Sequence, residues 1–366
     1  MMTQDQLGRF RVRLVQAIEE HREAVQPPPL AISPWIAMSM LQKSIRRSKT
    51  ATALRAASTL LSVAPDRLWR RLGGAAFEDV GLGSMGAIGL TTVALSGKRF
   101  RASLGGDWAV ASTTVKTLCV APKSRASDDL FMALETLPKL RGKRKEYAAF
   151  SDQDLQSIVL NANCLETRAL AFLYLLGIRR PCGLSARRGE PSRAFDLLDE
   201  MGVAATLIAV CREGHKKTGE LLPPLIAMLA LHDGLRDGAS EDEIPRENWV
   251  GEVPCWASDM FTREGRSALA RLLKTNAGVA ELVRARVHEP LRLNFVGQLL
   301  FRVEGGVLKR RTRGVLADRL HTQFLYNTLG VEPSCAAEAL GLMREALPLL
   351  DQIRADVLNS RGNDAR

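Results

Sequence analysis

The residues of this chain that could support hydrolytic or metal chemistry are few and poorly arranged. His232-Asp233 is a dipeptide typical of metal-dependent phosphohydrolases, but no other histidine or aspartate stands at a matching spacing. Glu78 and Asp79 are a weak metal candidate, because adjacent side chains of a helix point in different directions. The chain contains neither a nucleophile–histidine pattern nor a Gly-Lys-Ser/Thr phosphate loop. We therefore predict a protein that is not an enzyme and has no cofactor or metal.

The cysteines and the N-terminal residues indicate a compartment. The six cysteines are scattered, and no Cys-x-x-Cys pair or zinc-ligand spacing is present. Free thiols in a reducing compartment are the simpler interpretation. Residues 1–10 contain no apolar signal segment, and no stretch reaches the length of a membrane span. These patterns predict a cytoplasmic protein.

The charge balance suggests a polyanionic partner. Lys and Arg total 51 against 40 acidic residues, which gives a net charge of +11. Such an excess attracts nucleic acid through counterion release. The cations of three basic segments are the candidate nucleic-acid-binding residues: Lys43, Arg46, Arg47, Lys139, Arg141, Lys143, Arg144, Lys145, Lys309, Arg310, Arg311 and Arg313. The alternative is that all three segments are solvated surface, and no interleaved aromatic residues indicate base stacking.

The placement of these segments follows from the expected elements. Met38, Leu41 and Ile45 form an apolar stripe on a helix, so Lys43 and its basic neighbours are expected on an exposed opposite face. Pro138 and Gly142 predict that residues 139–145 form an exposed loop. Residues 309–313 follow a candidate short hairpin over 300–308, and residues 236–254 are expected to form a polar surface loop.

The remaining pattern is helical. Aromatic residues are only 5% of the chain and Ala and Leu dominate the apolar set, which favours an all-α fold. Ser33-Pro34 is a predicted helix start, and Gly81 a predicted helix end. Helices are expected over 7–18, 34–47, 50–61, 66–80, 107–120, 127–138, 152–178, 191–213, 218–235, 263–275, 280–303, 314–329 and 335–358. We expect two helical lobes, with an N-terminal helix and connector over 1–34 and domains over 35–140 and 146–366.

The loop before residue 263 is the most distinctive part of the second half. Thr262 or Asp259 is a predicted N-cap, and Trp256 and Phe261 are expected to anchor the loop in the core. Arg263 and Arg266 would then stand at a helix start that favours anions. A purely structural loop is the alternative.

Several ordered motifs share the region 35–140. Leu41-Gln42-Lys43-Ser44-Ile45-Arg46 is followed by Arg70-Arg71-Leu72, by Glu78-Asp79-Val80-Gly81-Leu82 and by Ala121-Pro122-Lys123-Ser124. In type and spacing this region resembles the C-terminal helical region of the replication-associated recombination protein A (RarA) family of clamp-loader-like AAA+ ATPases. The first lobe is therefore expected to be similar to the clamp-loader collar. We expect structural ion pairs from Arg70, Arg71, Glu78 and Asp79.

The chain departs from the family in two respects. No ATPase motif is present, and Gln42 stands where the family has a histidine. The resemblance therefore implies oligomer assembly and action at replication forks with single-stranded-DNA-binding protein, but not ATP hydrolysis. The sequence predicts a non-catalytic, DNA-associated accessory or assembly factor in replication, recombination or repair. It is expected to form a homo-oligomer and to work with a separately encoded AAA+ ATPase. A protein–protein scaffold without nucleic-acid contact is the alternative, and a hidden nuclease or phosphohydrolase a third class.

Overall fold

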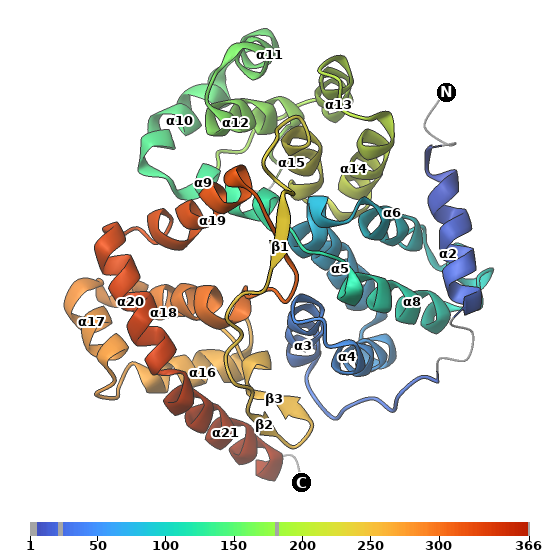
Figure 1. The fold of residues 1–366 in the computed structure, drawn as a ribbon. Coiled ribbons are helices and arrows are strands. Elements are labelled where there is room, and N and C mark those ends of the chain that lie inside the picture. Colours follow the sequence, from blue (N-terminus) through green and yellow to red (C-terminus); the bar gives the residue numbers. More distant parts are fainter. Residues whose placement is uncertain (1–5, 21–24, 180–182, 365–366) are drawn as a thin grey trace.

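The computed structural model describes residues 6–20, 25–179 and 183–364, and the structural statements below concern these residues. Helices dominate and confirm the all-α fold (Figure 1). The first helices are α2 (Gly8–Glu20), α3 (Pro34–Arg46), α4 (Thr50–Val63), α5 (Pro65–Ala75), α6 (Met85–Ala94), α7 (Lys98–Ala102) and α8 (Asp107–Val120). A middle group comprises α9 (Ala126–Thr136), α10 (Arg141–Ala149), α11 (Asp152–Asn161), α12 (Leu165–Leu176), α13 (Pro191–Glu200), α14 (Ala205–Thr218) and α15 (Leu222–Leu229). The last group comprises α16 (Arg263–Leu272), α17 (Gly278–Arg286), α18 (Arg292–Leu300), α19 (Val315–Asn327), α20 (Pro333–Glu345) and α21 (Leu347–Asp364).

The predicted helix starts are present. The Ser33 side chain accepts a hydrogen bond from the backbone N–H of Ile36, with Pro34 in the first turn of α3. At the start of α16 the hydroxyl of Thr262 accepts a hydrogen bond from the backbone N–H of Gly265. Each side chain therefore satisfies one backbone donor that its helix leaves without an internal partner.

The predicted helix end at Gly81 is a sharp chain reversal. The backbone φ of Gly81 is 45°, and a Cβ there would lie 2.8 Å from the carbonyl oxygen of Ser124. Only glycine fits this chain reversal without strain.

Two hydrophobic cores organise the molecule. The first core contains buried residues from α2 through to Ala257, and it is completed by Ala317 and Leu320 of α19. The second core contains buried residues between 268 and 357, chiefly from α16 to α18, α20 and α21. In Figure 1 the last group of helices lies to the lower left, except for α19, which crosses to pack against α9. The first core continues across residues 139–145, and the division at this segment stays a prediction.

Strands are short and correct two expectations. β1 (Gly238–Ser240) pairs antiparallel with β4 (Arg311–Arg313), and β2 (Trp249–Val250) pairs with β3 (Val253–Pro254). Residues 236–254, expected to be a loop, therefore contribute three strands. The predicted hairpin over 300–308 is wrong, because residues 301–305 form a π-helical turn that continues α18. Val303, Val307 and Leu308 are buried there, so the apolar pattern reflects packing and not strand pairing.

The predicted basic loop over 139–145 is also wrong. Pro138–Leu140 form a 3-10 turn and Arg141–Ala149 form α10, with Gly142 inside the helix. Tyr147 on the buried side of α10 packs into the first core, which gives this polar segment a reason to be helical. The basic side chains are consequently fixed on a helix and not carried on a flexible loop.

Close packing around Phe77 leads to a testable expectation. Phe77 lies in the π-helical turn Ala76–Val80, and a Cβ added to Gly214 of α14 would lie 2.2 Å from its ring. We expect Gly214→Ala to lower the free energy of unfolding by about 1–3 kcal/mol, because the buried ring must shift. Gly341→Ala in α20 is the matched control, since nothing lies within 4 Å of the added methyl group. Denaturant titration should show this control unchanged or stabilised by up to about 1 kcal/mol; equal effects of the two substitutions would contradict the expectation.

Candidate functional site

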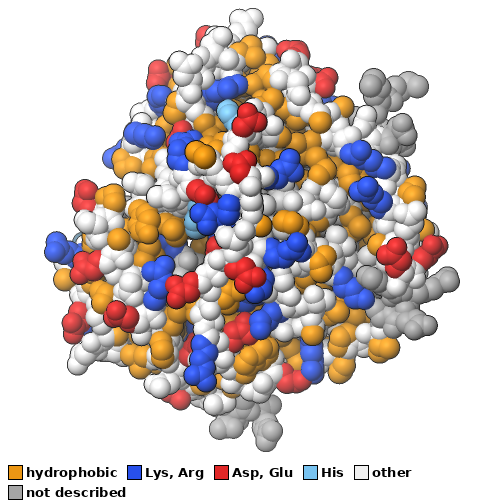
Figure 2. Space-filling model, viewed as in Figure 1, with side chains coloured by type: hydrophobic (Ala, Val, Ile, Leu, Met, Phe, Trp, Pro, Cys, Tyr) orange, Lys and Arg blue, Asp and Glu red, His pale blue; other side chains and the backbone are white. Residues whose placement is uncertain are grey.

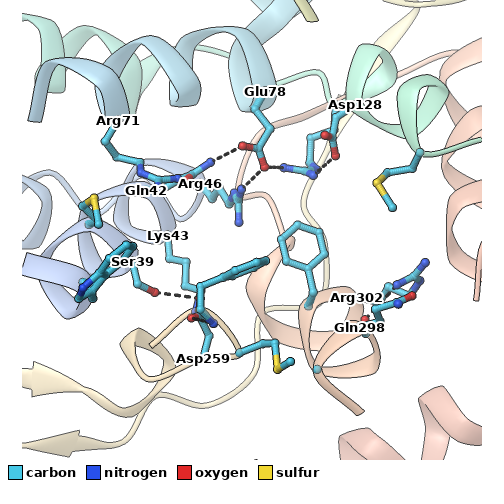
Figure 3. Close-up of a pocket in the computed structure, with 18 of the residues that line it drawn as sticks. Ser39, Gln42, Lys43, Arg46, Arg71, Glu78, Asp128, Asp259, Gln298 and Arg302 are labelled. Carbon is cyan, nitrogen blue, oxygen red and sulfur yellow. Dashed lines mark hydrogen bonds and ion pairs between the residues drawn. The ribbon is translucent and has the colours of Figure 1, made fainter. Parts of the chain in front are cut away.

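A pocket of about 660 Å³ lies where the two cores meet (Figure 3). Its lining comes from α3, α5, the π-helical turn Ala76–Val80 and α9 on one side. On the other side it comes from α16, α18, the π-helical turn Phe301–Gly305 and α19, together with the loop before α16. The floor of this pocket includes Arg46, Glu78 and Arg125 from the first side, and with the buried Asp79 they form the densest group of ion pairs in the described part of the chain.

The acidic centre of this floor is the pair Glu78 and Asp79. Arg46 donates from Nε to Asp79 and from Nη2 to Glu78, each at 2.7 Å. Arg125 Nη1 donates to Asp79 at 2.5 Å and to Glu78 at 3.0 Å. Gln42 Nε2 also donates to both carboxylates, at 2.8 and 3.0 Å. The two acids therefore converge, although adjacent helical side chains were expected to diverge, because the segment is a π-helical turn and not a regular α-helix.

The electrostatic consequence is a carboxylate that stays ionised. Burial opposes ionisation of Glu78, but Arg46 and Arg125 outweigh it and lower its pKa to about 2. Asp79 is fully buried, and Glu78 is the more exposed of the pair, with 24% of its side chain accessible. With both carboxylates held by guanidinium groups, this pair acts as a structural anchor.

A second group of contacts ties α3 to the loop before α16. Lys43 Nζ lies 2.7 Å from Asp259 Oδ2 and donates to the carbonyl oxygen of Trp256 at 2.5 Å. Ser39 donates to the same Asp259 carboxylate at 3.0 Å. Burial lowers the pKa of Lys43 to about 8, although Asp259 and Glu304 oppose the shift. Asp259, expected only as a candidate helix cap, thus also neutralises a buried cation.

A third group lies deeper and reaches the C-terminal helix. Arg354 of α21 donates to Glu304 at 2.9 and 2.7 Å and to Asp351 at 2.7 Å. Arg47 donates to the backbone carbonyl of Glu304 at 2.6 Å, and its guanidinium stands 4.7 Å from the Trp256 ring centroid. Arg354 has 1% exposure and is the largest fully buried side chain described. A continuous polar network therefore runs from α5 to α21.

The expectation of an exposed basic face on α3 is wrong. Lys43, Arg46 and Arg47 have only 2%, 3% and 3% exposure, respectively. The apolar stripe of α3 packs into the first core, and residues 256–305 cover the opposite arc with Asp259 and with the backbone carbonyls of Glu304 and Gly305. The carboxylates that pair with Arg46 and Arg47 come from Glu78, Asp79 and Glu247. These three cations are consumed by internal contacts and cannot meet a phosphate backbone without breaking them.

The motifs that carry the RarA resemblance meet in this network. Lys43 and Arg46 come from the first motif, Glu78 and Asp79 from the third, and Arg125 directly follows the fourth. In the fourth motif Lys123 has 0% exposure and donates from Nζ to the carbonyl oxygens of Cys119 and Ala121 at 2.9 and 2.8 Å. The N–H of Ser124 bonds to the carbonyl of Val80 at 3.1 Å, which joins the third and fourth motifs.

Two of the four predicted structural ion-pair residues behave differently. Glu78 and Asp79 are ion-paired as expected. Arg71 reaches the network through a neutral contact, from Nη1 to Gln42 Oε1 at 2.5 Å. Arg70 is exposed and bonds to the carbonyl oxygen of Asp66, one turn earlier in α5. Within the described ranges, neither arginine forms an ion pair, because the acids they were expected to meet are occupied by Arg46 and Arg125.

The basic segment 139–145, at the start of α10, remains largely open to solvent. Lys139, Arg141 and Lys145 are exposed, and the Lys139 ammonium lies 3.6 Å from Glu166. Lys143 donates to the Thr167 hydroxyl at 2.9 Å, and Arg144 donates to the carbonyl oxygens of Leu134 and Leu137 at 2.9 and 3.1 Å. Three cations of this segment are therefore available to a partner, and two are engaged within the fold.

The charges of the basic segment 309–313 are mostly neutralised by ion pairs within the fold. Lys309 pairs with Glu241, Arg311 lies 2.7 Å from Asp242, and Arg313 lies 2.6 Å from Asp318. Arg310 is exposed and donates to the carbonyl oxygen of Val120. Figure 2 shows the same mixing more widely, with basic and acidic side chains interspersed over the visible face. The segment holds β1 and β4 together and offers little uncompensated charge.

Sequence reasoning missed Arg125, Asp128, Glu304 and Arg354 as members of the network. Only Arg125 had a usable signal, since it adjoins the fourth motif.

Cys119, Cys164, Cys211, Cys255 and Cys335 are free thiols, and Cys182 lies outside the described residues. The described residues contain no group of three or more His, Cys, Asp or Glu placed to hold a metal ion. Nor does any described helix combine the length and apolarity needed to cross a membrane. Comparisons of the chain with protein-family models, curated proteins and solved structures find no match.

Proposed function

We propose that this chain is a non-catalytic, DNA-associated accessory or assembly factor in replication, recombination or repair. The observation that carries the proposal is the contact between the separate motifs of the RarA resemblance in one buried cluster. Arg46 and Asp79 belong to separate motifs of the resemblance and form an ion pair, and Arg125, which directly follows the fourth motif, pairs with the same carboxylate. This supports a shared helical platform for residues 35–140, through which the chain self-associates.

The distribution of charge supports contact with DNA outside the buried network. The cations of the network are nearly balanced by its carboxylates, so most of the +11 excess lies on the remaining surface. The exposed members of the candidate set with the least compensation are Lys139, in the 3-10 turn before α10, and Arg141 and Lys145 on α10. We assign them to sequence-independent contacts with the phosphate backbone. A separately encoded AAA+ ATPase or a single-stranded-DNA-binding protein is the proposed protein partner.

The test is binding to single-stranded and forked DNA across a salt series. We expect affinity to fall steeply with salt, and the triple variant Lys139→Glu, Arg141→Glu and Lys145→Glu to flatten the log–log slope by about 2. The matched control reverses three exposed cations on other elements, Arg263, Lys274 and Arg286. No binding at low salt, or the same loss in both triple variants, would overturn the DNA assignment. Light scattering coupled to gel filtration tests self-association, and a monomer at all concentrations would remove that part.

The second candidate function is a helical protein–protein scaffold. The basic segment 309–313 favours it, since Lys309, Arg311 and Arg313 form ion pairs within the fold and are not available to DNA. A scaffold would keep its oligomeric state and its protein partners in the α10 triple variant and would show no salt-dependent DNA affinity. The two readouts therefore separate the candidates.

A further inference from the structure

We propose that the pocket between the two cores binds a nucleotide unit, a planar base together with its phosphate. The inference rests on the proposed DNA association for the source of that unit, but the pocket itself supplies the argument. Its volume of about 660 Å³ is in the range of small-ligand sites. Its lining combines an excess of positive charge with two exposed aromatic side chains.

The charge of the lining favours an anion. Lys43, Arg46 and Arg125 are offset by carboxylates that also line the pocket, whereas Arg71, Arg266 and Arg302 form no ion pair within the described residues. Three guanidinium groups therefore leave a net positive pocket. A phosphate is the anion that such groups bind best, since each can donate two hydrogen bonds.

Each of these three arginines has a distinct part. Arg71 uses Nη1 for Gln42, so its other nitrogens are free to donate. Arg266 is exposed at the start of α16, and its guanidinium forms no hydrogen bond or ion pair with the described residues. Arg302 uses four of its five N–H donors on Gln298, Phe324 and Thr328, so its chief contribution to the pocket is its charge. Burial lowers the pKa of Arg302 to about 10, although the charges of Asp129 and Asp128 act to raise it. Arg302 therefore remains protonated at neutral pH.

The aromatic lining favours a planar base beside the phosphate. Trp35 and Phe261 line the pocket yet expose 53% and 75% of their surface, respectively. Trp256 and Phe261 were both expected to anchor this loop in the core. Trp256 is buried as expected, but Phe261 is exposed. Arg67 lies 4.6 Å from the Trp35 ring centroid, so a cation supports that ring. Exposed rings next to free guanidinium groups form the combination that holds unstacked nucleotides.

The pocket floor is held rigid before any ligand arrives. Arg46 and Arg125 stand 5.2 and 5.0 Å from the centroid of the Phe301 ring, which also lines the pocket. Both guanidinium groups are fixed by Glu78 and Asp79. Figure 3 shows Arg46 and Glu78 pointing toward each other. Binding therefore costs little reorganisation of the floor, and the adjustable groups are those at the rim.

Calorimetry with adenosine 5′-monophosphate as the probe tests the proposal, with adenosine and inorganic phosphate as the two half-ligands. We expect the monophosphate to bind more tightly than either half-ligand. Arg266→Glu and Phe261→Ala should each weaken it by roughly tenfold or more. Arg263→Glu is the matched control on the same helix, since Arg263 is exposed but lies outside the pocket. Leu291→Ala is the control for loss of an exposed apolar side chain.

A substitution that should tighten binding is also needed, because a variant that fails to fold cannot bind more tightly. Burial raises the pKa of Asp128 to about 7, with Glu78, Asp129 and Asp79 adding to the shift and Arg125 opposing it. Asp128 lines the pocket, so its ionisation above this pH repels an anion. Asp128→Asn should bind the probe about threefold more tightly than the parent protein at pH 8. At pH 6 the parent carboxyl is mostly protonated, and the two proteins should bind alike.

A further experiment distinguishes a nucleotide within a DNA strand from a free nucleotide. It measures binding of a short single-stranded oligodeoxyadenylate. If the oligonucleotide binds and Arg266→Glu weakens it, the pocket holds one nucleotide of a strand; if only the monophosphate responds, the ligand is a free nucleotide. If DNA binding is lost in the triple variant while Phe261→Ala and Arg266→Glu change neither DNA binding nor monophosphate binding, the pocket assignment is overturned and the proposed function stands. Monophosphate binding without any DNA binding would do the reverse. Displacement of the probe by a polyglutamate peptide at equal concentration would also overturn it.

Discussion

Asp79→Ala should lower the free energy of unfolding by about 3–5 kcal/mol, one of the two largest single-residue effects we expect. Asp79 is fully buried and accepts hydrogen bonds from Arg46, Arg125 and Gln42. Its removal leaves two buried guanidinium groups sharing only Glu78 and, for Arg125, Asp128. Asp79→Asn preserves the shape and loses the charge, so it should fall between the parent protein and the alanine variant.

The measurement is chemical denaturation followed by circular dichroism. Glu252→Ala is the control, because Glu252 pairs with Arg55 at the surface, where its side chain is 59% exposed. A surface pair of this kind contributes at most about 1 kcal/mol. If Asp79→Ala cost no more than Glu252→Ala, the buried cluster would not be an anchor of the fold.

Arg354→Ala should have a comparable effect, again about 3–5 kcal/mol. The substitution removes the largest fully buried side chain described and leaves the carboxylate of Glu304 buried without its bidentate partner. Burial opposes ionisation of Glu304, and Arg354 is the main cause that its pKa is nevertheless lowered. The stability that this pair contributes is therefore present at neutral pH and is lost as acid protonates the carboxylate.

A double-mutant cycle isolates this pair. We expect Arg354→Met combined with Glu304→Gln to be less destabilising than the sum of the two single substitutions by at least about 1 kcal/mol, because neither leaves the other's charge unpaired. Additive effects in denaturation would show that the packing of Arg354, and not its charge, holds α21 against the turn Phe301–Gly305.

Local signals in the sequence suffice for the helices and several of their ends. Ser33, Gly81 and Thr262 act through hydrogen bonds and backbone angles set by neighbours within a few residues, so their roles follow from residue type. The type of helix is harder to predict. Residues 76–80 and 301–305 form π-helical turns, and nothing in their composition distinguishes them from ordinary helix.

The candidate site could be predicted only in part, because its partners come from distant segments. The spacing in α3 correctly places Met38, Leu41 and Ile45 in the core, but it contains no information on Asp259, which lies 2.7 Å from Lys43. A cation opposite an apolar stripe is normally solvated, and here the loop before α16 covers it with Trp256 and Asp259. Charge alone assigned Lys43, Arg46 and Arg47 to an exposed surface, whereas all three are buried.

The completion of the first core by α19 has a consequence for synthesis on the ribosome. Ala317 and Leu320 join residues that begin at Phe10, and all of α16 to α18 is translated between Ala257 and these two residues. An emerging chain must therefore keep the matching side of α9 uncovered until α19 leaves the exit tunnel, since that helix packs against it. Nascent chains halted before Val315 should be more readily cleaved by protease near α9 than chains halted beyond Asn327.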